Sequence, residues 1–176
     1  MKFTWTPGSA CNFPLLLIAF LLVAVPQHST FAQIHEEGGD TKDRIAIQET
    51  LLYAYAYKYD SKDCVGWANL FSADAVLSLG AAMKISGRDA ILQGCIERQK
   101  SVVGNVKTRH NMTNIVFDQL TSRQAKTRTY CVLTWQKPGD MTPNIQAAFV
   151  YRDVIVKQRD GRWLFKERVG VDPPNL

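Results

Sequence analysis

The strongest constraint on the fold is the β-rich second half of the chain. Four long segments there are dominated by β-branched and aromatic residues, a composition that favours strands: Val106–Asp118, Ala125–Gln136, Ile145–Lys157 and Trp163–Val169. The links between them are short and hold turn residues, with Asp160-Gly161 the clearest hairpin signal. Consecutive strands joined by such links predict an antiparallel sheet in which each strand pairs with the next.

The preceding segment shows helical spacing instead. From Thr41, apolar residues recur at steps of three and four, which predicts a helix of about four to five turns with one apolar face. These apolar residues are Ile45, Ile47, Leu51, Leu52, Tyr55 and Tyr59. The run Tyr59-Asp60-Ser61-Lys62-Asp63 then collects turn formers, so the helix should end there, with Asp60 at its terminus.

Two more helices and two short strands complete the expected first half. A short helix should follow the turn and include Phe71, and another should start at Gly87-Arg88-Asp89. Between these helices, Ala75–Leu79 and Ala82–Ile85 are short β-like runs on either side of Gly80.

Helices followed by a meander of strands indicate an α+β fold with a strongly curved sheet folded over the first helix. The chain has 176 residues, which is enough for one core and short for two, so a single domain is expected. A sheet curved in this way leaves a cavity between its concave face and the helices. Such a cavity is the default position for a ligand.

The first 32 residues read as a secretory signal peptide. The apolar run Phe13–Val25 suits the hydrophobic region of a signal and is shorter than the roughly 20 residues of a membrane-spanning helix. Thr30-Phe31-Ala32 supplies the cleavage site. Residues 33–40 should then form a disordered leader and residues 41–176 the domain, secreted or periplasmic and without a stable membrane anchor. An uncleaved anchor is the alternative.

Neither the cysteines nor the charge indicates a zinc site or a nucleic-acid partner. Cys64, Cys95 and Cys131 remain after cleavage and show no CxxC spacing, so we interpret them as small buried apolar residues. One pair is open to a disulfide in an oxidising compartment, but the spacing does not identify it. The net charge of +5 is scattered among acidic residues rather than gathered in a stripe, which argues against nucleic acid.

Two residues are candidates for acid–base chemistry, Asp60 and His110. His110 lies in the polar stretch Thr108–Asn114, within a strand that turns apolar at Ile115. Each has a structural interpretation of its own, as a hydrogen-bonded strand histidine and as an aspartate that accepts bonds from turn amides. Side by side, the carboxylate would fix the tautomer of the imidazole and make it a general base near neutral pH.

Five segments occur in an order that is typical of one known family: Tyr59-Asp60-Ser61-Lys62-Asp63, Phe71-Ser72-Ala73-Asp74-Ala75, Gly87-Arg88-Asp89-Ala90-Ile91, Thr108-Arg109-His110 and Asp160-Gly161-Arg162-Trp163-Leu164-Phe165. Over nearly the whole of Thr41–Val169 the chain resembles the SnoaL-like family of the nuclear transport factor 2-like superfamily. The resemblance implies a cone-shaped, curved antiparallel sheet packed around helices and closed over a pocket. The last motif supports the fold alone, with the turn fixing a hairpin and the tryptophan filling the core.

At the acid–base candidates the chain is similar to the scytalone dehydratases and hexachlorocyclohexane dehydrochlorinases of this family, in which an aspartate–histidine pair removes a proton from carbon while a leaving group departs. The similarity implies that His110 is the base, Asp60 its orienting partner and Tyr59 a hydrogen-bond donor. It also implies these substrate-binding positions: Tyr55, Met112, Cys131, Ala147, Phe149 and Arg152. Ala147 marks a departure, because scytalone dehydratases have a second pocket histidine there. The same substrate is therefore not expected, and the general acid stays open.

Further polar side chains have supporting roles to fill. The candidate proton donors, which also have the spacing of core residues, are Tyr53, Tyr55, Tyr130 and Tyr151. A developing enolate needs a donor aimed at its oxygen, and the candidates are Arg109, Arg128 and Arg152. Alternation along the strand places Asp153 on the side of Phe149 and Tyr151, so we interpret it as a buried structural carboxylate.

The leading functional hypothesis is a cofactor-free lyase or isomerase that abstracts a proton from carbon in a small apolar or polycyclic molecule. The sequence holds no Gly-rich phosphate loop and no metal-ligand cluster, so no cofactor and no metal are expected. The alternative is a non-catalytic small-molecule-binding or dimerisation module of the same fold. The family resemblance also implies a homo-oligomer, paired through the outer face of the sheet.

Overall fold

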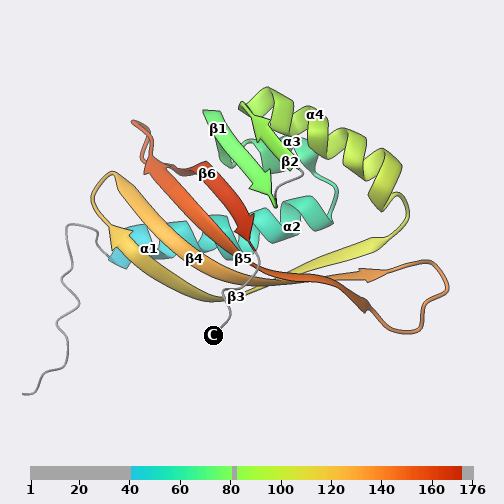
Figure 1. The fold of residues 1–176 in the computed structure, drawn as a ribbon. Helices are drawn as coiled ribbons and strands as arrows, with labels where there is room; N and C mark the ends of the chain where they lie inside the picture. The colour runs from blue at the N-terminus through green and yellow to red at the C-terminus, as the bar shows by residue number, and fades with distance from the viewer. Residues whose placement is uncertain (1–40, 81–82, 172–176) are drawn as a thin grey trace, which may run out of the picture. The chain divides into compact units, whose positions relative to one another are not determined.

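The computed structural model describes residues 41–80 and 83–171. The predicted signal peptide and leader lie outside these residues. Two layers make up the described part, a set of helices and a curved sheet (Figure 1). In order, the elements are α1 (Thr41–Gln48), η1 (Glu49–Ala54), α2 (Tyr55–Asp60), α3 (Cys64–Ala68), β1 (Phe71–Leu79), β2 (Met83–Ser86), α4 (Arg88–Arg98), η2 (Gln99–Val103), β3 (Lys107–Leu120), β4 (Gln124–Gln136), β5 (Asn144–Lys157) and β6 (Trp163–Val171).

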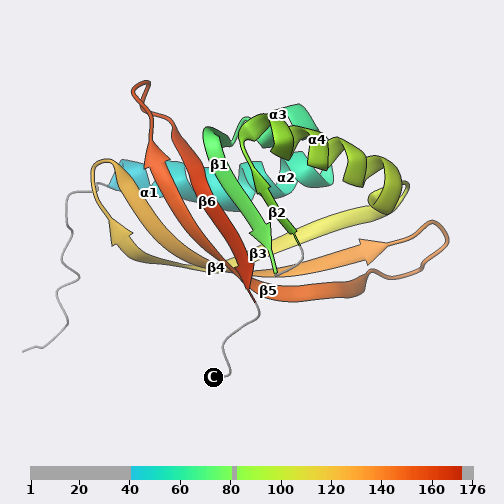
Figure 2. The ribbon, with the colours of Figure 1, turned by 45° about the horizontal axis from the view of Figure 1, so that its top comes forward.

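The predicted first helix is present as one continuous segment over α1, η1 and α2, with a π-helical turn at its centre. Most of its apolar face is buried, with Ile47 and Leu51 fully covered and Tyr55 and Tyr59 nearly so, but Ile45 is 50% exposed, contrary to the prediction. The segment lies across the concave side of the curved sheet (Figures 1 and 2). It ends at Asp60 because the next turn brings Lys62 to a positive φ of 65°, which a continuing helix does not allow.

The sheet has six strands in the order β2-β1-β6-β5-β4-β3. The meander of four long strands is confirmed, with antiparallel pairs β3–β4, β4–β5 and β5–β6. Gly161, at φ 85°, closes the tight hairpin between β5 and β6. β1, however, pairs with β6 in parallel, so the sheet is mixed rather than wholly antiparallel. A parallel neighbour needs a long crossover, and here α4 and the whole meander supply it.

The predicted second helix is shorter than expected. α3 ends at Ala68, and Phe71 is the first residue of β1 rather than the end of the helix. The cause lies in tertiary packing: the Leu70 carbonyl accepts a hydrogen bond from the Phe165 amide, which draws the chain onto the edge of β6. Phe71 is fully buried there, with its ring 5.2 Å from that of Phe165.

The sheet is curved because its ladders are interrupted by bulges. The β3–β4 register shifts between Thr113 and Val116, where Asn114 has φ 52°, and again between Phe117 and Gln119. Further shifts occur in the β4–β5 and β5–β6 pairs. Bulges bend a strand and increase its twist. The long strands therefore wrap around the helical segment instead of lying flat (Figure 2).

A buried ion pair lies within the core, between β5 and β6. Asp153 accepts hydrogen bonds from Arg168 at 2.8 and 3.0 Å, and neither side chain is exposed. The guanidinium also stacks on three aromatic rings, with its carbon 4.0 Å from the centre of the Tyr55 ring. Asp153 is thus the buried structural carboxylate that strand alternation predicted. Trp163 is buried too and donates its indole N–H to Asp43 at 2.9 Å.

A disulfide joins the two helices that pack beside β1 and β2. Cys64 of α3 and Cys95 of α4 are bonded, with their Cα atoms 5.7 Å apart. The interpretation of these two cysteines as unpaired is therefore wrong. Sequence spacing could not show it, because the pair is 31 residues apart and meets only when α4 folds back on α3. Cys131 is a free, buried thiol, as expected.

Candidate active site

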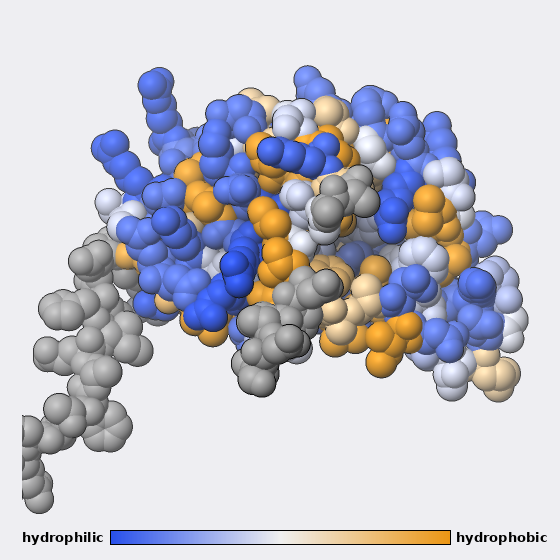
Figure 3. Space-filling model, viewed as in Figure 1, coloured by the Kyte–Doolittle hydropathy of each residue, from blue (hydrophilic) through white to orange (hydrophobic). Residues whose placement is uncertain are grey.

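A cavity of about 370 Å³ lies between the helices and the concave face of the sheet. This volume suits one small organic molecule. In Figure 3 the face toward the viewer is hollowed, and hydrophobic side chains gather around the hollow. Aliphatic and aromatic side chains make up most of the lining: Leu77, Leu79, Met83, Ile85, Ile91, Val103, Leu133, Ala147, Phe149, Tyr151 and Val171.

Asp60 and His110 are adjacent at the edge of this cavity. Asp60 Oδ1 lies 2.7 Å from His110 Nδ1, and the His110 side chain is 6% exposed. The second carboxylate oxygen accepts the His110 backbone N–H at 2.8 Å, and Thr108 Oγ1 donates to Oδ1 at 2.8 Å. The end of α2 is thereby fixed to the start of β3, with the imidazole on the cavity side.

The hydrogen-bond network determines which ring nitrogen is free. Burial raises the pKa of Asp60. Hydrogen bonds from the His110 ring, the His110 backbone and Thr108, together with the charge of His110, lower that pKa by more, so the net shift is downward. The carboxylate is therefore ionised at neutral pH and accepts the proton on Nδ1. In the neutral imidazole this leaves Nε2 with a lone pair, on the ring edge opposite Asp60.

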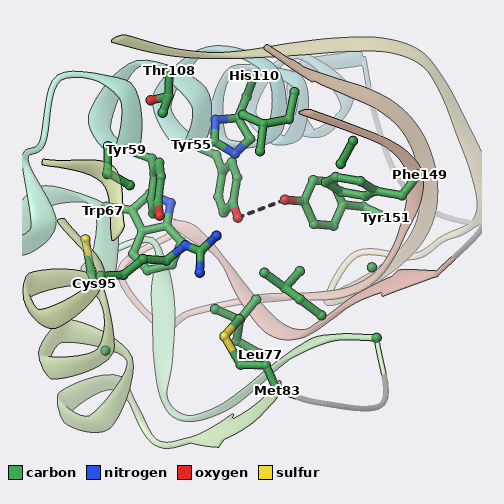
Figure 4. A pocket seen from close by; sticks show the side chains of 18 of the residues that line it. Tyr55, Tyr59, Trp67, Leu77, Met83, Cys95, Thr108, His110, Phe149 and Tyr151 are labelled. Carbon is green, nitrogen blue, oxygen red and sulfur yellow. Dashed lines mark hydrogen bonds between the residues drawn. The ribbon is translucent and has the colours of Figure 1, made fainter. Parts of the chain in front are cut away.

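Aromatic rings hold the imidazole in place. The Tyr59 ring meets that of His110 edge-on with centres 5.1 Å apart, and the Tyr55 ring does so at 6.0 Å. Tyr55 also shares a hydrogen bond of 3.2 Å with Tyr151 (dashed in Figure 4). Burial raises the pKa of Tyr55 to about 12. Both tyrosines of that pair stay neutral and act as packing groups.

The cavity has a polar end and an apolar end. Figure 4 shows Tyr59, Trp67, Thr108 and His110 together on one side, with Phe149 and Tyr151 on the other. Arg98 also lines the cavity and hydrogen-bonds the Tyr59 hydroxyl. Burial raises the pKa of Tyr59 more than Arg98 lowers it, so the phenol remains a donor.

Three of the six predicted substrate-binding residues line the cavity, namely Tyr55, Ala147 and Phe149. Arg152 does not, because alternation along β5 turns it to the outer face, opposite to its buried neighbours. Met112 is half-buried against the core, and Cys131 is 1% exposed within it. Burial raises the pKa of the Cys131 thiol to about 12. Both residues pack in or against the core, and neither lines the cavity.

The remaining polar candidates lie elsewhere. Arg128 forms an exposed ion pair with Asp118, and Arg109 is exposed beside Gln136. Tyr53 is 59% exposed on the outer side of the helix, and Tyr130 is 37% exposed. Of the candidate proton donors only Tyr55 and Tyr151 line the cavity.

Sequence reasoning missed Arg98, Trp67 and Trp135 as cavity residues. For Arg98 a signal was present, because Ile91, Cys95 and Arg98 lie at helical steps of four and three and share a face of α4. Trp67 was read only as an apolar residue of the short helix. Trp135 carried no distinguishing pattern within its strand.

The described residues hold no group of three or more His, Cys, Asp or Glu side chains that could bind a metal ion. Over the same residues, no helix is long and apolar enough to cross a membrane.

A family model described as a SnoaL-like domain matches residues 40–169. Among solved structures, the chain is similar to ActVI-ORFA from Streptomyces coelicolor, with a TM-score of 0.66 and 17% identity over 74% of this chain and 97% of that one. It is also similar to an NTF2-like protein with a cystatin-like fold from Novosphingobium aromaticivorans, with a TM-score of 0.65 and 18% identity over 73% and 80% of the two chains.

A third similar structure, from Novosphingobium aromaticivorans, is provisionally named a scytalone dehydratase. Its TM-score is 0.63, with 24% identity over 77% of this chain and 90% of that one. No curated protein sequence matches the chain. At these identities the solved structures establish the shared fold, the curved sheet with its covering helices.

Proposed function

The chain belongs to the SnoaL-like family, and from its cavity we propose that it is a lyase or isomerase that removes a proton from carbon with His110 as the base. The observation that carries the proposal is the 2.7 Å contact between Asp60 Oδ1 and His110 Nδ1 at the wall of a largely apolar cavity. The provisional name of one structural relative, a scytalone dehydratase, agrees with this reaction class.

In the proposed reaction, His110 Nε2 takes a proton from a carbon of the bound molecule. The C–H bond breaks, an N–H bond forms, and the electron pair moves into the substrate. Asp60 stabilises the imidazolium that results and keeps the ring oriented. Loss of a neighbouring group then gives the lyase outcome, whereas return of the proton to another atom gives the isomerase outcome. The volume and the apolar walls of the cavity suit a small ring compound.

The test is a screen of hydroxylated and ketonic ring compounds in deuterated water, read by NMR for carbon-bound deuterium and for eliminated product. We expect His110→Ala to lower the rate by about a hundredfold to ten-thousandfold, the usual contribution of a general base. Arg109→Ala is the matched control, since it lies one residue away and is exposed outside the cavity. Activity that survives in His110→Ala would remove the proposed base.

A non-catalytic binding module is the second candidate, and one observation favours it. Asp60 also accepts the His110 backbone amide and the Thr108 hydroxyl, so the residue ties α2 to β3 whether or not any reaction follows. In that case ring compounds would bind without deuterium exchange, and His110→Ala would change affinity alone.

Export remains part of the proposal. Disulfides form and persist in secreted and periplasmic proteins and are rare in the cytosol. The Cys64–Cys95 bond therefore supports the signal peptide predicted for residues 1–32. Pairing of two copies through the outer face of the sheet stays a prediction of the family resemblance.

A further inference from the structure

The polar end of the cavity holds hydrogen-bond donors that the reaction described above does not use. Trp67 is 3% exposed and lines the cavity, and its indole Nε1 is buried without a hydrogen-bond partner among the described residues. A buried N–H left unpaired is costly. Such a donor on a cavity wall indicates an acceptor on the molecule that enters.

Arg98 adds a positive charge to the lining of the same cavity. Among the described lining residues it is the only Lys or Arg, and no Asp or Glu lines the cavity with it. Its contact in the described part of the chain is the Tyr59 hydroxyl, and it forms no ion pair there. The guanidinium has more donors than one phenol oxygen can accept, so donors remain for a ligand.

These donors lie next to the proposed base. The Tyr59 ring stands between them, 5.2 Å from the Trp67 ring and 5.1 Å from the His110 ring, centre to centre. Figure 4 shows the three side chains on one wall of the cavity, opposite Phe149. A molecule with its apolar body against Phe149 therefore presents its polar edge to the Tyr59, Trp67 and His110 wall.

We propose that Arg98, Tyr59 and Trp67 form an oxyanion site, and that the substrate is a ring ketone or phenol-like compound whose oxygen becomes negatively charged there. This rests on the proposed function. When His110 takes the proton from the carbon next to the carbonyl, the C–H pair becomes the new C=C bond and the carbonyl π pair moves to oxygen as an enolate. Donors fixed in advance around that oxygen stabilise the charge as it develops.

The experiment measures equilibrium binding and needs no turnover. Para-nitrophenol is titrated into the full-length protein, because its anion and its neutral form have different absorption spectra. Para-nitroanisole is the matched ligand, with the same ring and nitro group but no ionisable hydroxyl. The variants are Arg98→Met, Trp67→Phe and, as a charge control, Lys100→Met, which removes an exposed cation two residues from Arg98.

We expect the wild-type protein to bind nitrophenol as the anion, more tightly than nitroanisole. Arg98→Met should weaken binding of the anion by about tenfold to a hundredfold, the usual contribution of a hydrogen bond to a charged group, and leave nitroanisole unchanged. Trp67→Phe should have a smaller effect in the same direction. Lys100→Met should leave both ligands unchanged.

Equal affinity for the two ligands in the wild-type protein, a neutral spectrum of the bound phenol, or no binding of either would overturn the oxyanion site. An Arg98→Met effect no larger than that of Lys100→Met would overturn it as well. If Arg98→Met does not fold, the wild-type spectrum and the comparison of ligands decide. The proposed function fails separately, through carbon–proton exchange that persists in His110→Ala.

Discussion

The molecule contains two buried contacts between a carboxylate and a basic side chain, and they differ in one respect. Asp153 and Arg168 are both fully buried, and the pair is enclosed by aromatic rings. Asp60 and His110 are as close, at 2.7 Å against 2.8 Å, but their side chains remain 20% and 6% exposed, and His110 borders the cavity. Tyr55 touches both groups, with its ring against the guanidinium and 6.0 Å from the imidazole.

The difference separates structure from chemistry. In the Asp153–Arg168 pair, the charge of Asp153 offsets the effect of burial and raises the pKa of Arg168, so the guanidinium stays protonated and has no lone pair to offer. In the other pair the carboxylate uses one ring nitrogen and leaves the second free. Burial and a strong ion pair do not identify a reactive site by themselves. The proposed reactivity of His110 rests on a further feature, a free lone pair on the wall of a cavity.

The largest effect should come from breaking the enclosed pair. Asp153→Ala leaves the Arg168 charge buried without its counterion, which costs about 3–5 kcal/mol of stability. Asp118→Ala, which breaks the exposed pair with Arg128, should change stability little, because water screens that pair. Denaturant unfolding of both variants checks this, and similar losses in the two would contradict the contrast.

Removing the disulfide should have the next largest effect on stability. The bond joins α3 and α4, two helices that line the cavity. The Cys64→Ser and Cys95→Ser double variant frees a loop of 31 residues, which lowers the free energy of unfolding by about 3 kcal/mol. Reductant should destabilise the wild-type protein by a similar amount and leave the double variant unaffected. A double variant as stable as the oxidised wild-type protein would show that α3 and α4 are held by packing alone.

The smallest effect concerns the pH dependence of the Asp60 contact. The folded-state pKa of Asp60 is lowered, so its contribution to stability is present above the unfolded aspartate value and is lost as the pH falls through the folded value. Thr108→Val removes one hydrogen bond that lowers this pKa, at a cost of about 1 kcal/mol. In this variant the stability contributed by Asp60 should therefore be smaller, and its loss should be complete at a higher pH.

Thr129→Val is the matched control for that measurement. Thr129 is fully buried, and its hydroxyl has no hydrogen-bond partner among the described residues. Its acid unfolding should follow that of the wild-type protein. Equal shifts in Thr108→Val and Thr129→Val would show that the Thr108 hydroxyl has no influence on Asp60.

Local patterns in the sequence predict the buried position of Asp153, the first helix and the strand meander well. The period of two along β5 placed Asp153 inside, and the same period should have placed Arg152 outside, where the structure has it. Helical spacing predicted the segment ending at Asp60. The meander followed from the four β-rich runs, because each paired element there is next to its partner in the chain.

The parts that sequence did not predict all depend on distant segments. The parallel β1–β6 pair forms when the first half of the chain folds onto the second. The Cys64–Cys95 bond and the placement of Arg98 beside Tyr59 form within the first half, when α4 folds back on the earlier helices. No local period encodes such contacts. The Asp60–His110 contact has the same character, since 50 residues separate the two, and it was expected through the family resemblance rather than from the residues themselves.

The most direct test of the account is the tautomer of His110 in the free protein, measured by nitrogen-15 NMR and assigned with His110→Ala. In the neutral ring, we expect the proton on Nδ1 and an unprotonated Nε2. Asp60→Asn should reverse this, because an amide can donate to Nδ1. A protonated Nε2 in the wild-type protein would contradict the central claim that His110 offers a base to the cavity.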